Sequence, residues 1–100
     1  MTDPWAPWRP NCTEYFSNFN GGRYDQSGQH WFILDESAIS TESNRGDLVI
    51  GSAGCDDISF CFRQGMPGIW AYYPIEAEHI LVAHDMQELE KGWLDGSIKV

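Results

Sequence analysis

The chain has few basic residues and no cluster of them. Its 100 residues include six lysines and arginines against fifteen aspartates and glutamates, for a formal net charge of −9. No two bases are neighbours: Arg9, Arg23, Arg45, Arg63, Lys91 and Lys99. Nucleic-acid binding needs a clustered basic face that displaces counterions, so we expect no nucleic-acid partner. The acidity is explained either by solubility or by a negative face that meets a basic protein.

Long apolar runs and an even cysteine count are also missing. No stretch approaches the roughly 20 apolar residues of a membrane span, and the first residues lack the basic start and apolar run of a secretory leader. The three cysteines, Cys12, Cys55 and Cys61, are an odd number, which fits a reducing compartment. We therefore expect a cytoplasmic protein without membrane contact, folded as one domain over residues 1–100.

The first twenty residues are rich in aromatic side chains. Residues 1–10 carry three prolines with Trp5 and Trp8, and proline blocks helix and central strand, so this segment is predicted to be an extended arm. Its tryptophans either cover the edge of the core or bind a partner. Residues 11–20 are predicted to form a helix, ended by Gly21 and Gly22, with one apolar face: Cys12, Tyr15, Phe16 and Phe19.

The middle of the chain, Gly46 to Pro74, reads as three short strands. Leu48 to Gly51 is a continuous apolar run. Apolar and polar side chains alternate along residues 58–63, and along residues 69–73 one set, Ile69, Ala71 and Tyr73, alternates with Trp70 and Tyr72. Gly51 and Gly54 bracket a tight turn between the first two strands. Connections this short require antiparallel neighbours, because a parallel crossover needs a dozen or more residues.

Strands are also predicted at residues 30–34 and 79–83, with a short edge strand at 97–100. The polar residues 23–29 are predicted to form a turn, and residues 35–46 a loop with one helical turn. A C-terminal helix opens at Asp85 and closes at Gly96, and Gly92 within it would let it lie close to the sheet. The prediction is an α+β fold: a mostly antiparallel sheet of four to six short strands, with an N-terminal helix and a C-terminal helix packed against it.

Four segments, in this order, resemble the SUKH superfamily over about residues 10–100: YFSNFNGG (15–22), GDLVIGSAGCDDISF (46–60), PGIWAYYP (67–74) and GWLDG (92–96). The sequence departs from the family in having Cys55 where a further glycine is usual, and in its short N-terminal part. The resemblance implies a single α+β domain that binds protein without catalysis. Bacterial members are commonly immunity proteins that neutralise co-encoded toxins, often nucleases, and fungal members regulate cell-wall synthesis.

The sequence gives little support for chemistry. Ser52 lacks the glycine spacing and following helix of a nucleophile elbow, and the same turn lacks the lysine of a phosphate loop. Possible metal ligands do not match the close ligand pairs of structural zinc sites: Cys55, Cys61, His79 and His84. We therefore expect no metal, no cofactor and no catalytic residue. A small hydrolase that uses Asp57 with His79 or His84 is the weakest alternative.

The resemblance, together with the net charge of −9, implies a protein partner, such as a basic toxin domain. The candidate contact residues are five acids and two aromatics, the latter because tryptophan and tyrosine are enriched at binding hot spots: Asp25, Asp56, Asp57, Glu76, Glu78, Trp70 and Tyr72. The other interpretation is that the acids are solvated and only shape turns, and that the two rings pack under a helix. A regulatory scaffold without a toxin partner is the alternative function.

Overall fold

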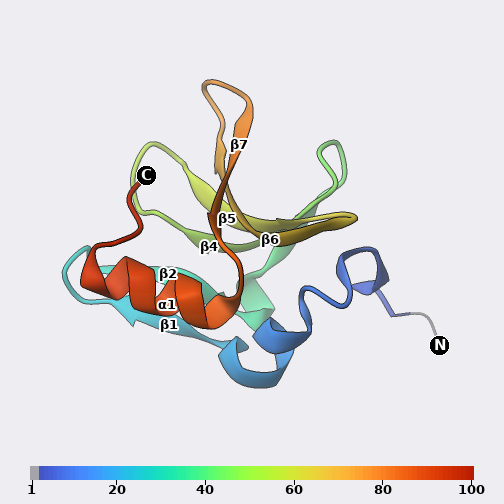
Figure 1. Cartoon of the computed structure of the whole chain (residues 1–100), viewed down its shortest axis with the longest axis horizontal. Coiled ribbons are helices and arrows are strands. Elements are labelled where there is room, and N and C mark those ends of the chain that lie inside the picture. Colours follow the sequence, from blue (N-terminus) through green and yellow to red (C-terminus); the bar gives the residue numbers. More distant parts are fainter. Residues whose placement is uncertain (1–2) are drawn as a thin grey trace.

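The computed structural model describes residues 3–100 and is built on one antiparallel sheet (Figure 1). Within these residues the sheet has seven strands, in the order β1-β2-β4-β5-β6-β7, and β3 also pairs with β4. The strands are β1 (Gly21–Asp25), β2 (His30–Asp35), β3 (Ser40–Glu42), β4 (Asp47–Ser52), β5 (Ser59–Arg63), β6 (Met66–Tyr73) and β7 (Glu78–Ala83). The α+β class and the antiparallel sheet are confirmed, but the sheet has more strands than the four to six predicted.

The two strands that the sequence did not predict are β1 and β3. Residues 23–29 were expected to be a turn, yet β1 pairs with β2 from Gly21↔Asp35 to Asp25↔His30. Residues 35–46 were expected to be a loop with one helical turn; the turn exists at Glu36–Ala38, and β3 follows it. Both extra strands have mostly polar side chains, which do not favour a strand by themselves. They become strands because each pairs with a more apolar neighbour, β1 with β2 and β3 with β4.

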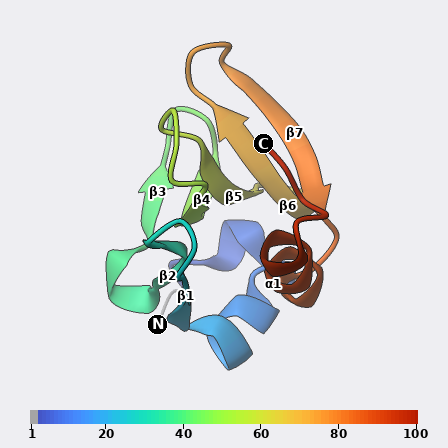
Figure 2. The same ribbon diagram turned by 90° about the vertical axis from the view of Figure 1, so that its left-hand side faces the viewer.

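The core lies on one face of this sheet. Figures 1 and 2 show the sheet curling, with the N-terminal segment and the helix α1 (Met86–Asp95) along its open side. Alternation along β4, β5 and β6 turns one set of side chains inward. The fully buried members include Leu48, Ile50, Phe60, Ile69 and Ala71.

Helix α1 begins and ends as the sequence predicted. The carboxylate of Asp85 accepts from the backbone N–H of Glu88 at 2.8 Å, and Gly96 closes the helix in the left-handed region with φ 82°. The role expected for Gly92 was wrong: a Cβ there would lie 2.6 Å from the side chain of Ile98. Gly92 thus makes room for the following tail, not for the sheet, and the predicted strand at 97–100 is absent from the described chain.

A regular helix over residues 11–20 is not found. The structure has a 3₁₀ turn at Ala6–Trp8 and a short π-helical turn at Tyr15–Phe19. Packing determines this segment, because Tyr15 and Phe19 are both buried and the Tyr15 hydroxyl donates to the carbonyl of Leu34 at 2.5 Å.

Gly21 and Gly22 begin β1 rather than only ending a helix. Gly22 has φ +79°, and a Cβ on it would lie 2.8 Å from the carbonyl oxygen of Ile33. Both the left-handed backbone and the close approach of β2 therefore require glycine at this position.

The proline-rich start packs on the domain. Trp8 is buried, and its indole N–H donates to the carbonyl of Gly46 at 3.0 Å. Trp5 stacks on Phe16 with ring centroids 5.3 Å apart. Residues 3–10 are thus not an extended arm, and their tryptophans cover the edge of the core; Met1 and Thr2 lie outside the described residues. No helix among residues 3–100 has the length and apolar character needed to cross a membrane.

Candidate functional site

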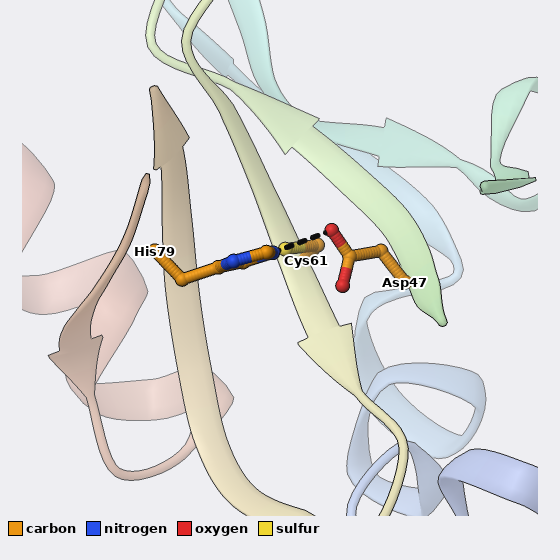
Figure 3. A group of neighbouring side chains, drawn as sticks. All are labelled: Asp47, Cys61 and His79. Carbon is orange, nitrogen blue, oxygen red and sulfur yellow. Dashed lines mark hydrogen bonds and ion pairs between the residues drawn. The ribbon is translucent and has the colours of Figure 1, made fainter. Parts of the chain in front are cut away.

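A polar cluster lies on the face of the sheet opposite the core. Strand pairing puts Tyr72 of β6 beside His79 of β7, and Cys61 of β5 beside Trp70 of β6. Because paired residues share a face, these side chains gather away from the core. Asp47, at the start of β4, completes the group, and Figure 3 shows it converging with Cys61 and His79.

Asp47 is the centre of this cluster and is fully buried. Its Oδ2 accepts from Nε of Arg45 at 2.9 Å and lies 2.7 Å from Nε2 of His79. An ionised carboxylate only accepts hydrogen bonds, so Nε2 of His79 carries a proton in this arrangement. Oδ1 of Asp47 is buried and has no hydrogen-bond partner among the described residues.

Arg45 and Tyr72 cover the buried carboxylate. The guanidinium carbon of Arg45 lies 3.8 Å from the Tyr72 ring centroid, and the Tyr72 and His79 rings are 4.8 Å apart. The side chains of Arg45 and His79 are 25% and 12% exposed, so the cluster contacts solvent through both of them.

Cys61 is the third member of the group. Its Sγ donates to the carbonyl of Trp70 at 3.6 Å. Burial, with the nearby Asp47 carboxylate, raises the pKa of the Cys61 thiol well above its usual range. The thiol is therefore protonated at neutral pH and is a poor nucleophile.

A second feature is an acidic hollow of about 280 Å³ at the turn between β6 and β7. Its walls combine apolar and acidic residues: Asp56, Ile58, Tyr73, Pro74, Ile75, Glu76 and Val100. Ile75 is 83% exposed at the rim.

The structure brings together part of the predicted contact set. Asp56 and Glu76 both line the hollow, Asp57 follows Asp56 in the same exposed turn, and Glu78 is paired with Tyr73 across β6 and β7. Asp56 and Asp57 have φ 53° and 57°, which shows that both residues shape the turn in the left-handed region.

The other three predicted contact residues lie elsewhere. Trp70 and Tyr72 face the polar cluster, because they alternate with Tyr73 along β6. Asp25 accepts from the indole N–H of Trp93 at 2.8 Å, and it also caps the turn after β1. These hydrogen bonds, the Trp93 bond above all, lower the pKa of Asp25.

Gly51, within β4, and Gly54, in the turn after β4, both have structural roles. A Cβ on Gly51 would lie 2.2 Å from the carbonyl oxygen of Phe32, so β2 and β4 can approach only at glycine. Gly54 has φ +80°, and its N–H donates to Oγ of Ser52 at 3.1 Å. The histidines considered for a hydrolase bond other acids than Asp57: His79 bonds Asp47, and His84 bonds Glu88.

Sequence reasoning missed Arg45 and Asp47. The available signal was a charged residue directly before a buried apolar run, in RGDLVI. A carboxylate at the start of a strand whose side chains are buried on both faces needs a hydrogen-bond donor or a positive charge within the fold.

Comparison with family models gave no match, and comparisons with curated proteins and with solved structures gave no significant match.

Proposed function

We propose that the protein is a non-catalytic protein-binding module whose acidic hollow meets a basic partner. The observation that carries this proposal is the hollow itself, in which Asp56 and Glu76 flank an apolar surface that includes Tyr73. Protein hot spots combine a desolvated apolar centre with a polar rim. A lysine or arginine side chain fits this surface, because its aliphatic stem packs on apolar groups while its charge meets the acids.

Among residues 3–100, no ion pair offsets the charge of the acids around the hollow. Three of the six bases pair with acids outside the hollow, in the pairs Arg9–Asp3, Arg23–Glu90 and Arg45–Asp47. Within the part of the chain that the structure describes, no ion pair involves Asp56, Asp57, Glu76 or Glu78. Such a field attracts a basic partner and speeds association, most strongly at low salt.

Ile75 adds an apolar contact beside the charges. A side chain of this size that is 83% exposed contributes little to the core, but it would be covered in a complex. Burying it would contribute about 1.5–3 kcal/mol to binding before the costs of association.

The partner class that we propose is a co-encoded bacterial toxin, often a nuclease, so that the protein acts as an immunity protein. This choice rests on the resemblance to the SUKH superfamily and on the negative charge of the hollow, which would attract a basic nuclease surface. A regulatory scaffold would use the same surface with a different partner.

The test is binding to the toxin domain encoded beside this protein, measured by association kinetics at several salt concentrations. The double variant Asp56→Asn/Glu76→Gln should associate roughly 10-fold more slowly and show a weaker salt dependence. The control variant Glu36→Gln/Glu42→Gln removes the same charge from exposed positions on η3 (Glu36–Ala38) and β3. Equal slowing in both variants would show that only net charge matters, and absence of binding by the native protein would remove the toxin partner.

A further inference from the structure

We propose that Asp47, Cys61 and His79 form a zinc-binding site on the face of the sheet opposite the core. The three residues come from β4, β5 and β7 and are separated in sequence by 14 and 18 positions. Each offers one ligand atom, and these atoms all lie within 4.8 Å of one another (Figure 3). This site is independent of the acidic hollow and of the proposed partner.

The set of ligand atoms favours zinc over other common ions. A thiolate sulfur, an imidazole nitrogen and a carboxylate oxygen are the three ligand types that Zn²⁺ takes in proteins. A thiolate is a poor ligand for Mg²⁺ or Ca²⁺, which prefer oxygen. With metal–ligand bonds of about 2.0–2.3 Å, two ligands of a tetrahedral zinc lie roughly 3.5 Å apart. Side-chain rotations that bring these atoms, now within 4.8 Å of one another, closer by up to about 1.3 Å would close the site.

The orphaned oxygen of Asp47 is the second, independent observation. Asp47 is fully buried, and its Oδ1 has no hydrogen-bond partner in the described chain. A buried oxygen of an ionised carboxylate is costly unless it meets a donor or a cation. Oδ1 can ligate zinc while Oδ2 keeps its hydrogen bond from Nε of Arg45.

Binding changes the protonation of two ligands in a balanced way. The Cys61 thiol releases one proton to solvent as the sulfur–zinc bond forms. His79 moves its proton from Nε2 to Nδ1, so that Nε2 gives up its hydrogen bond to Asp47 and holds the metal. The cluster gains the two positive charges of Zn²⁺ and loses one proton, so its net charge rises by one.

Arg45 limits the affinity of the site. Its guanidinium lies beside Asp47 and repels a second cation, so binding should be weaker than at a closed site with four protein ligands. Three protein ligands also leave a fourth position for water. His79 and Arg45 are partly exposed, which gives an entry path from solvent.

The test uses the full chain, reduced and stripped of metal with a chelator, and titrated with Zn²⁺ or Co²⁺ alone. Bound Co²⁺ should give the sulfur-to-cobalt absorption band of a thiolate ligand and strong tetrahedral bands. Cys61→Ser should abolish the sulfur band, and His79→Gln should weaken Zn²⁺ binding by at least about 10-fold, the loss seen even for outer contacts of a site.

Matched controls are Cys55→Ser and His84→Gln, which change an exposed thiol and an exposed imidazole outside the cluster. Both should bind Zn²⁺ as the native chain does. Circular dichroism checks that each variant is folded. If Cys61→Ser does not fold, the test rests on His79→Gln, because His79 is partly exposed and its replacement should disturb the fold less. The proposal is overturned if the native chain shows no sulfur band with Co²⁺, if His79→Gln binds normally, or if a control loses binding equally.

Discussion

Replacing Gly51 by alanine should destabilise the fold strongly, although it adds a single methyl group. The new Cβ would lie 2.2 Å from the carbonyl oxygen of Phe32, whereas real Cβ atoms almost never approach closer than 3.0 Å. Strands β2 and β4 would therefore have to separate by at least about 0.8 Å. The obstacle is backbone, which cannot rotate aside as a side chain can.

We expect a loss of about 3 kcal/mol in the free energy of unfolding, at the upper end of overpacking effects. With a urea slope of about 1.5 kcal/mol/M for a small protein, the midpoint should fall by roughly 2 M. The matched control is Gly21→Ala, because Gly21 also lies in a strand but a Cβ there meets nothing within 4 Å. That variant should be neutral or more stable by up to about 1 kcal/mol. Equal midpoints for the two variants would refute the close-approach argument.

Two further predictions concern Asp25 and Trp8. The pKa of Asp25 is lowered in the folded state. Ionised Asp25 therefore stabilises the fold fully above its unfolded pKa of about 3.9. This stabilisation is lost as the pH falls through the folded pKa. Asp25→Asn should lower the melting temperature at neutral pH, and the difference in melting temperature between the variant and the native protein should become smaller in acid. A difference that does not change with pH would contradict this link between ionisation of Asp25 and stability. Trp8→Phe should cost about 1–3 kcal/mol in urea unfolding, because it removes the hydrogen bond to Gly46 and leaves space in the core, and an unchanged midpoint would show that Trp8 contributes little.

The central strands and the C-terminal helix could be predicted because their signals are local. Residues 58–63 alternate in a period of two, and the caps of α1, Asp85 and Gly96, are within one element. β1 could not be predicted, since Arg23 and Asp25 read as turn residues and only pairing with β2 makes the segment a strand. The prediction of a regular N-terminal helix was wrong although the apolar spacing that suggested it is real. Tyr15 and Phe19 are both buried, and the segment packs as a short π-helical turn, which is wider than a turn of α-helix.

The two candidate sites were predictable to different degrees. Asp56 and Glu76 were chosen for their charge, and the structure puts both in one hollow. Side chains alternate along β6, so Trp70 and Tyr72 face one side of the sheet and Tyr73 faces the other. Because aromatic residues occur on both sides, the sequence does not tell which ring faces the hollow. The Asp47 cluster joins strands far apart in sequence, and the coiling of the sheet that brings them together leaves no local spacing to find.

The three thiols differ in a way that suits chemical labelling. Cys12 and Cys61 are buried, whereas Cys55 is exposed, next to Asp56 at the edge of the acidic hollow. A thiol-reactive dye added to the native protein under mild conditions therefore attaches at one place, without any engineered cysteine. The environment of that dye would change when a macromolecule covers the hollow, so the wild-type chain offers a natural attachment point for an optical probe of complex formation.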